Sequence, residues 1–275
     1  MLSVNWLGAA GAKSVGTVSK ALDLLDLFSR AQPRIGLSEL SRQAGVNKAT
    51  CFRLMSELQS RGLVEQVGAG REYRLGPAML RLAALREAEV PTRDAMQPVL
   101  QALARATGET AHLAQLVAGE LRMLSYAYSP AHAMRVMMED ADILPFHATS
   151  SGLVVLAHLA PSARAAILAR PLAAITSQTL TDADAVGGRL GQIRATGLAE
   201  STGGFEADVA SMAVPLFDAL GQVSGALAIA APAARMTAAL RQIARRSLTD
   251  ARAEATRLLG GAIPPDLLLE WQAQA

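Results

Sequence analysis

The sequence predicts an α+β protein with an N-terminal winged helix-turn-helix, a helical linker and a C-terminal domain built on an antiparallel sheet. Within residues 37–64, two short amphipathic helices are separated by Gly45 and followed by a glycine-tipped hairpin. After residue 109, paired strand-like segments are interspersed with helical ones. With 275 residues, 51% of them hydrophobic, the chain can bury the cores of two domains.

The domain boundaries follow changes in composition. We expect a flexible tail at residues 1–13, the winged helix-turn-helix at 14–76, the linker at 77–90 and the sheet domain at 91–275. The opening residues lack the basic start and apolar core of an export signal, and no apolar run of about 18 residues predicts a membrane span. The single cysteine, Cys51, excludes an internal disulfide and fits a reducing compartment. We therefore expect a cytoplasmic protein without a membrane partner.

The first helix is predicted within residues 15–29, where apolar residues recur with the spacing of one helical face, at Val18, Ala21, Leu22, Leu25 and Phe28. Pro33 disfavours helix just before itself and ends this segment. Ser38 then stands where a side-chain cap would begin the second helix, and Leu40 is expected to point inward.

The third helix is predicted from about Lys48 to Arg61, after the turn at Gly45. Asn47 can cap its start and Gly62 its end. Its buried stripe is expected to contain Cys51, Leu54 and Leu58, so Cys51 is interpreted as a core residue rather than a redox sensor. The outer face is polar and basic, with Lys48, Ala49, Thr50, Phe52, Arg53 and Ser56.

A small hairpin is predicted from Leu63 to Leu75, with its turn at residues 68–71. Arg71 lies at the tip of this wing and Arg74 close behind it. Three helices followed by such a hairpin are typical of a winged helix-turn-helix.

This arrangement indicates DNA binding. Residues 41–56 contain no Asp or Glu, and residues 1–90 carry 12 Lys and Arg against 8 Asp and Glu, a net charge of +4. Any amphipathic helix has a polar outer face, so it is the turn, the preceding helix and the wing together that favour DNA. We expect contacts to DNA from Ser38, Asn47, Lys48, Ala49, Thr50, Phe52, Arg53 and Arg71.

Further helices are predicted from Pro77 to about Glu89 and from Thr92 to Thr107, with apolar residues that suit a linker and a dimerisation element. Beyond them, strands are expected at 110–117, 121–128, 209–217 and 222–230. The intervening and final helices are expected at 150–159, 162–169, 182–196 and 236–259. Hairpins interspersed with helices predict an antiparallel α+β domain.

No pattern for catalysis or for a cofactor is present. The sequence has no nucleophile elbow, phosphate-binding loop or dinucleotide fingerprint. Its four histidines show none of the spacings of a metal site. His147 is expected to order the loop before the helix at 150–159, and Gly203–Gly204 to lie in a loop. We expect no enzymatic activity, cofactor or metal.

The chain resembles the IclR family of bacterial transcriptional regulators. The resemblance rests on SVGTVSKALDLLDLF and LSELSRQAGVNKATCFRLMSELQSRGLV near the N-terminus, on ILPFHATSSGLVVLA at 143–157, and on FEADVASMAVPLFDALGQVSGALAIAAP at 205–232. The resemblance implies a winged helix-turn-helix, a helical linker and a GAF/PAS-like effector-binding domain, assembled as a dimer or tetramer. It also implies a repressor or activator of a catabolic operon that responds to a small organic acid or aromatic compound.

Carried over by motif, the resemblance places an effector pocket at Phe146, Ser150, Ser151, Ser201, Val209, Ser211, Ala228 and Ala230. Leu153 stands where the family often has lysine, and Gly204 where it often has glutamate, although Glu206 is close. Ala228 and Ala230 stand where relatives that bind compact carboxylates often have serines. Because a buried carboxylate needs paired donors, we expect a larger or more apolar effector, such as an aromatic acid.

The sequence therefore predicts a ligand-responsive transcription regulator whose partners are double-stranded DNA, a small-molecule effector and further copies of the chain. Two alternatives stay open. A sensor domain that has lost its ligand would leave a constitutive DNA-binding regulator, an alternative that Ala228 and Ala230 keep open. An enzyme acting through the C-terminal domain is opposed by the lack of a nucleophile and base pattern.

Overall fold

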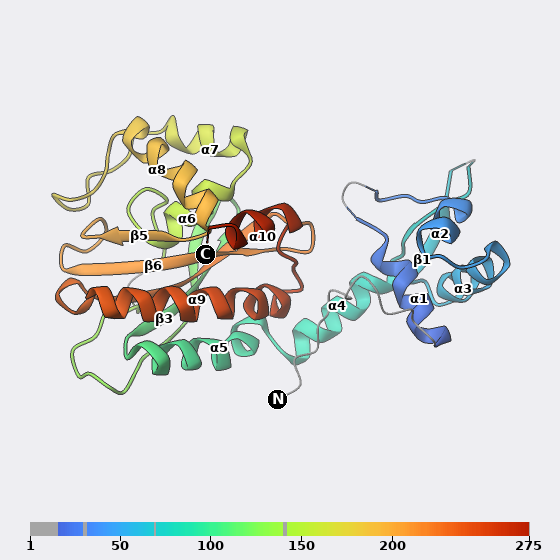
Figure 1. Cartoon of the computed structure of the whole chain (residues 1–275), viewed down its shortest axis with the longest axis horizontal. Coiled ribbons are helices and arrows are strands. Elements are labelled where there is room, and N and C mark those ends of the chain that lie inside the picture. Colours follow the sequence, from blue (N-terminus) through green and yellow to red (C-terminus); the bar gives the residue numbers. More distant parts are fainter. Residues whose placement is uncertain (1–15, 30–31, 69, 140–141, 275) are drawn as a thin grey trace. The chain divides into compact units, whose positions relative to one another are not determined.

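The computed structural model describes residues 16–29, 32–68, 70–139 and 142–274 (Figure 1). The chain divides into two compact units between Glu89 and Val90. The tail expected at residues 1–13 lies outside the described residues.

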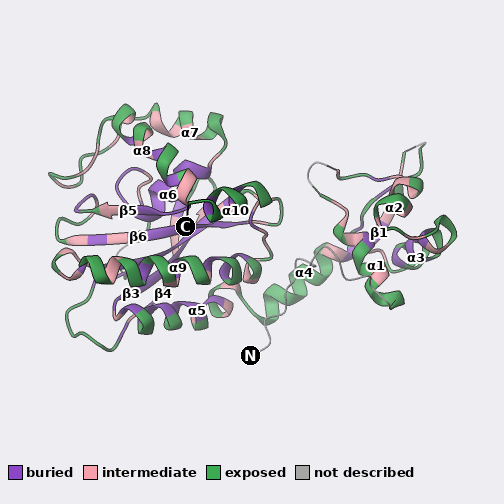
Figure 2. Cartoon of the chain, viewed as in Figure 1, coloured by how far each residue is buried: buried purple, intermediate pink, exposed green. Residues whose placement is uncertain are grey.

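The N-terminal unit is a winged helix-turn-helix, as predicted. Its elements are α1 (Thr17–Asp26), α2 (Leu37–Gln43), α3 (Lys48–Ser60), β1 (Val64–Val67), β2 (Glu72–Leu75) and α4 (Ala78–Glu89). β1 pairs antiparallel with β2, and a bridge from Ile35 to Tyr73 adds the segment before α2 to the hairpin. Leu24, Leu40 and Met55 join these two side chains in one core, visible as purple segments in Figure 2.

The predicted boundaries of α3 are confirmed at both ends. Asn47 is the cap at its start. At its end, Gly62 has a φ of +70°, a conformation that glycine adopts without the steric cost of a side chain. The N–H groups of Gly62 and Leu63 then reach back to the carbonyls of Gln59 and Leu58, which closes the helix.

The face predicted for α1 is partly wrong. Leu24 is fully buried, whereas Val18 and Leu22 are 73% and 54% exposed. The segment ALDLLDLF has leucines on neighbouring faces of the helix, and packing against α3 selects the face that contains Leu24.

The cap predicted at Ser38 is also wrong. The backbone of Ile35 is hydrogen-bonded to Tyr73, so the chain is still extended at Gly36 and α2 begins at Leu37. Ser38 therefore lies exposed in the first turn, without a capping hydrogen bond.

The C-terminal unit contains one five-stranded antiparallel sheet in the order β4-β3-β7-β6-β5. The strands are β3 (Thr110–Val117), β4 (Glu120–Ala127), β5 (Ala199–Thr202), β6 (Val209–Phe217) and β7 (Val223–Pro232). The helices are α5 (Thr92–Thr107), α6 (Ser150–His158), α7 (Pro161–Leu168), α8 (Ala183–Thr196), a 3-10 turn η1 (Ala233–Arg235), α9 (Ala238–Leu258) and α10 (Pro265–Gln272).

Helices cover both faces of this sheet. α5 and α9 pack on one face, in a cluster that includes Leu100, Leu113 and Leu248. α6, α8 and α10 pack on the other, in a cluster that includes Leu153 and Trp271. Figure 1 shows the two helical layers on opposite sides of the strands. The unit is thus a three-layer α+β sandwich, in agreement with the predicted fold class.

Three elements of this unit were not predicted from the sequence: the short 3-10 turn η1, β5 and α10. β5 is only four residues long and joins the sheet as an edge strand. α10 follows Pro264 and is held by Trp271, whose indole Nε1 donates to the carbonyl of Arg194 at 2.8 Å.

The corrected face of α1 gives a paired prediction. Leu24→Ala is expected to lower the free energy of unfolding of the N-terminal unit by about 2–5 kcal/mol, because it leaves a cavity in the core. Leu22→Ala, the matched control on the exposed side, should change it by less than about 0.5 kcal/mol. Urea denaturation measures both, and equal losses would contradict the packing described.

Candidate functional site

The outer face of α3 is the first candidate site. The side-chain oxygen of Asn47 accepts the N–H of Thr50 at 2.8 Å and fixes where the helix starts. Cys51, Leu54, Met55 and Leu58 are buried on one face of α3, so the opposite face of the helix is turned to solvent. Exposed there are Lys48, Ala49, Phe52, Arg53 and Ser56, while Thr50 is half-buried. Phe52 is 55% exposed, so its ring is available to an apolar partner.

The positive side chains of α2 and α3 differ in whether an acidic side chain already binds them. Arg42 is hydrogen-bonded to Glu39 of the same helix, and this contact together with Gln43 lowers the pKa of Glu39 to about 2. Lys48 and Arg53, within the described part of the chain, have no acidic partner. These two cations therefore give the face its unpaired positive charge.

In the described part of the wing, Arg74 has an acidic partner and Arg71 has none. Arg71 is exposed with a φ of +51°, a left-handed conformation that is uncommon outside glycine. Arg74 lies opposite Glu65 in the hairpin and forms an ion pair with it at 2.6 Å. Arg71 is thus the more available of the two for an anionic partner.

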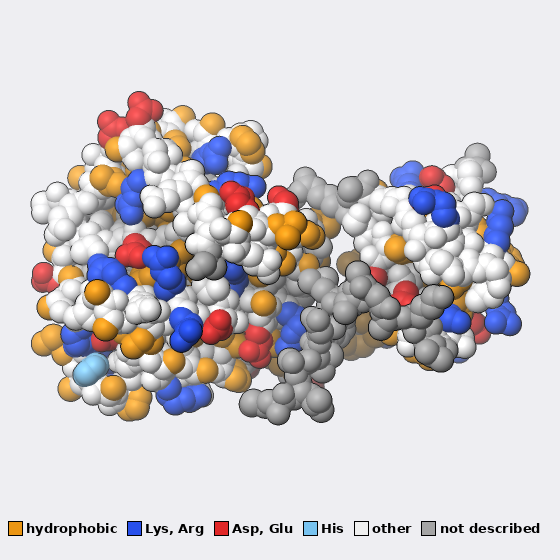
Figure 3. All heavy atoms as spheres, viewed as in Figure 1, with side chains coloured by type: hydrophobic (Ala, Val, Ile, Leu, Met, Phe, Trp, Pro, Cys, Tyr) orange, Lys and Arg blue, Asp and Glu red, His pale blue; other side chains and the backbone are white. Residues whose placement is uncertain are grey.

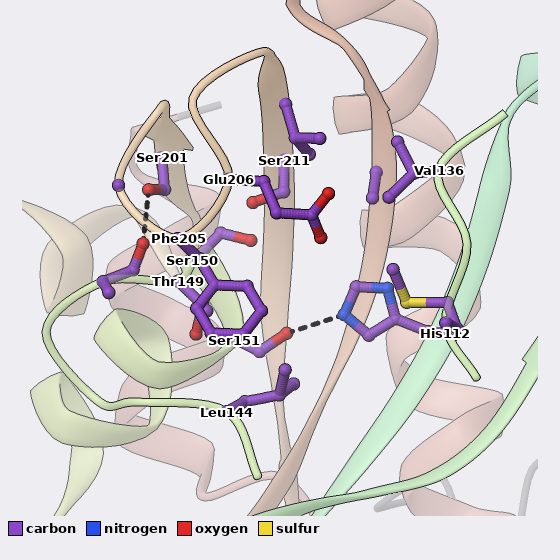
Figure 4. Close-up of a pocket in the computed structure, with 15 residues that line it drawn as sticks. His112, Val136, Leu144, Thr149, Ser150, Ser151, Ser201, Phe205, Glu206 and Ser211 are labelled. Carbon is purple, nitrogen blue, oxygen red and sulfur yellow. Dashed lines mark hydrogen bonds between the residues drawn. The ribbon is translucent and has the colours of Figure 1, made fainter. Parts of the chain in front are cut away.

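A pocket in the C-terminal unit is the second candidate site. The sheet register places Ser201, Ser211, Ala230 and Thr110 side by side in one row across β5, β6, β7 and β3. The start of α6, the loop that follows Gly203 and residues 136–138 complete the walls (Figure 4). The enclosed space between them is about 40 Å³, and the region through which it opens to solvent brings the total to about 440 Å³.

The first turn of α6 brings unpaired polar groups into this pocket. Thr149 caps the helix by accepting the N–H of Gly152 at 2.9 Å. A Cβ on Gly152 would lie 2.3 Å from the carbonyl oxygen of Pro145, so only glycine permits this close approach. Among the described residues, the buried Ser150 hydroxyl has no hydrogen-bond partner.

His112 and Ser151 form a buried polar pair in the pocket wall. Nε2 of His112 lies 3.2 Å from the Ser151 hydroxyl oxygen, as the dashed line in Figure 4 marks. Burial lowers the pKa of His112 to about 4, so the imidazole is neutral near pH 7. Its Nδ1, within the described structure, has no partner.

Glu206 is the charged side chain of the pocket. Its carboxylate projects into the space that His112 also faces (Figure 4), and burial raises its pKa. No Lys or Arg is among the lining residues in the part of the chain described. An anionic ligand would therefore depend on N–H and O–H donors rather than on a cation.

Most of the predicted effector residues lie together. Ser150, Ser151, Ser201, Val209, Ser211 and Ala230 line the pocket. Phe146 instead packs against the core beside α6, and Ala228 is fully buried in the row of His112, beneath that helix. Leu153, at the lysine position of the family, is a core residue rather than part of the pocket.

Other lining residues were missed by the sequence analysis. His112 follows Thr110 by two positions on β3, so strand alternation could have placed both on the pocket face. Val136, Met138 and Leu144 come from irregular chain, where no periodicity indicates a direction. His147 holds its loop as predicted, with Nε2 2.9 Å from the carbonyl oxygen of Ala173.

In the described ranges, no group of three His, Cys, Asp or Glu side chains could hold a metal ion. The same ranges contain no helix that combines the length and apolar character needed to cross a bilayer.

The winged helix-turn-helix of the N-terminal unit, with its exposed basic face, is the fold of a DNA-binding protein. The family profile described as the bacterial transcriptional regulator IclR C-terminal domain matches residues 83–256, and that of the IclR helix-turn-helix domain matches residues 17–68. The chain belongs to the IclR family of transcriptional regulators, as the sequence analysis expected.

Solved structures and curated proteins agree. An ICLR transcriptional regulator from Silicibacter sp. TM1040 is 53% identical, with a TM-score of 0.78 over 91% of this chain and 98% of the other. The glycerol operon regulatory protein of Streptomyces griseus is 30% identical over 82% of this chain and 88% of its own length. An IclR homologue from Microbacterium hydrocarbonoxydans, solved with 4-hydroxybenzoate, is 25% identical with a TM-score of 0.54, over 88% and 99% of the two chains.

The environment of His112 predicts acid sensitivity. Its pKa is about 4 in the folded state against an ordinary 6.5, so protonation favours the unfolded chain. The stability tied to this group is complete above pH 6.5 and is lost as the pH falls toward 4. Chemical denaturation of His112→Gln should show a loss between pH 7 and pH 5 that is smaller than the wild-type loss by on the order of 2 kcal/mol. Identical losses in both proteins would contradict the buried neutral imidazole.

Proposed function

We propose that this protein is a ligand-responsive regulator of a catabolic operon, a repressor or activator, that senses a small organic acid such as an aromatic acid. The observation that carries the proposal is the pocket in which the start of α6 presents unpaired donors. A regulator that binds an operator acts in the cytoplasm.

The proposed DNA contacts lie on α3 and the wing. Lys48 and Arg53 supply unpaired charge for phosphates or guanine edges, and Thr50 and Phe52 supply a hydroxyl and an apolar ring. Arg71 on the wing would reach the backbone or the minor groove. Ser38, Asn47 and Ala49 complete the proposed surface, Ser38 as an exposed residue of α2 rather than as its cap.

Two copies of the chain are proposed to act together. Leu80, Leu82 and Leu85 of α4 are exposed, which suits an apolar contact with a second copy. A dimer would present two α3 helices to half-sites about 34 Å apart. A tetramer remains the other assembly that the family resemblance implies.

The pocket chemistry supports an acid with an apolar body. The N–H groups of Ser150 and Ser151 lie at the start of α6, where the helix dipole favours negative charge. The unpaired hydroxyl of Ser150 adds a donor. The remaining wall is largely apolar, with Val136, Met138, Leu144, Phe205 and Val209. The 4-hydroxybenzoate bound to the Microbacterium homologue is an acid of this class.

We infer no catalytic role for the pair of His112 and Ser151. An activated serine needs a base that is itself oriented by a third group, and the Nδ1 of His112 has no such partner in the described structure. A pKa of about 4 also makes this imidazole a weak base near neutral pH.

Arg53→Ala is expected to weaken specific operator binding by about 1–3 kcal/mol, because it removes an unpaired guanidinium from the proposed groove-facing side of α3. Fluorescence anisotropy with the operator measures the loss. Arg246→Ala, which removes an exposed arginine of α9, is the matched control and should leave affinity unchanged. Wild-type affinity in Arg53→Ala would remove this residue from the interface.

Calorimetry is expected to show micromolar binding of 4-hydroxybenzoate or a related benzoate, and no comparable binding of glyoxylate or pyruvate. Ser150→Ala should weaken the benzoate at least about fivefold, because it removes a donor to the carboxylate. Micromolar binding of glyoxylate or pyruvate would contradict an effector with an apolar body. Absence of binding by any small acid would favour the constitutive regulator.

A further inference from the structure

A second polar site lies at the opposite side of β5 from the effector pocket. Ser201 of β5 faces the pocket, where its hydroxyl donates to the carbonyl of Ala148 at 2.9 Å. Successive side chains of a strand point to opposite faces, so the neighbouring Glu200 faces α9 instead. A groove of about 240 Å³ adjoins Glu200, between α8, β5 and α9.

Three arginines converge on Glu200. Arg241 donates from Nε to the carboxylate at 3.1 Å, and Arg245 lies 3.7 Å from its other oxygen. Arg189 of α8 donates to the backbone carbonyl of Glu200 at 2.7 Å, so its charge is not neutralised by the carboxylate. Figure 3 shows blue side chains around a red one over α9 and the sheet edge near β5.

The charges in this group do not balance. Arg241 is the arginine closest to the Glu200 carboxylate and is also bound to the carbonyl of Met236. Arg189 and Arg245 line the groove. The three arginines and Glu200 together carry a net charge of +2. Arg122 shows the opposite arrangement, with one guanidinium between Glu120 and Asp142. Arg241 and Arg245 share the Glu200 carboxylate, so one negative charge faces three positive ones, and a bound anion would offset the excess.

We propose that the groove lined by Arg189 and Arg245 is a second ligand site, distinct from the effector pocket, and that it binds a small phosphate-bearing anion. A phosphate dianion matches the excess charge, and its oxygens match the planar donor pairs of two guanidinium groups. Gln192 at the rim offers a further amide donor. Because β5 also carries Ser201, an anion bound here acts on a strand that the effector pocket shares.

The test is calorimetric titration of the full-length protein with inorganic phosphate at fixed ionic strength. Saturable binding is expected in the wild type, and Arg245→Gln should weaken it at least about tenfold, because it removes a charge-assisted hydrogen-bond donor. Arg246→Gln, an exposed neighbour of α9 outside the groove, should bind phosphate like the wild type.

The direction in which Glu200→Gln changes the affinity for phosphate separates the two interpretations of the groove. If the groove is an anion site, removal of the competing carboxylate should strengthen phosphate binding, whereas a purely structural ion-pair network gives no gain. Methyl phosphate is the second probe. If it competes with inorganic phosphate, the site also accepts phosphate esters. If inorganic phosphate binds more tightly than methyl phosphate, the free ion is the preferred ligand. A response equal to that of chloride, or equal losses in Arg245→Gln and Arg246→Gln, would overturn the proposal.

Discussion

The rest of the C-terminal unit depends on the burial of a polar helix start inside an apolar sandwich. Gly152 lets α6 approach the Pro145 carbonyl more closely than any side chain would allow. Thr149 satisfies one N–H of the first turn, but the Ser150 hydroxyl remains buried and without a partner in the described structure. Leaving such a group unpaired costs roughly 1–3 kcal/mol, and a bound ligand can recover that cost. At the pocket, the fold therefore keeps an unpaired polar group at a cost in folding free energy.

The DNA-binding unit works by an analogous contrast between paired and unpaired groups. Arg42 and Arg74 are paired with Glu39 and Glu65, whereas the exposed Lys48, Arg53 and Arg71 are not paired within the described residues and contribute to the positive surface. In the C-terminal unit, the pocket lacks a cation among its described lining residues, whereas the groove beyond β5 has an excess of them. The two faces of one edge strand thus present different chemistry.

The sequence was sufficient where a local signal fixes the outcome. Asn47 and Gly62 delimit α3 because capping depends on neighbouring backbone groups, and strand-like segments on either side of short glycine-containing turns indicated the four long strands. The sequence was insufficient where tertiary contacts determine which side chains are buried and where a helix begins. Leu24 rather than Leu22 is buried because α3 selects the face, and Ser38 loses its capping role because the chain before it pairs with Tyr73. Six pocket residues came from the family resemblance, whereas Val136 and Met138 lie in irregular chain that carries no period.

The central claim is that ligand binding at α6 changes the affinity for DNA. The most direct measurement is operator binding by the full-length protein, with and without a benzoate that calorimetry shows to saturate the pocket. The account predicts a change in operator affinity of about fivefold or more, in the range of a coupling free energy of roughly 1–3 kcal/mol. It further predicts that the operator changes the affinity for the benzoate by the same factor. Unchanged operator affinity at saturating ligand would contradict the account.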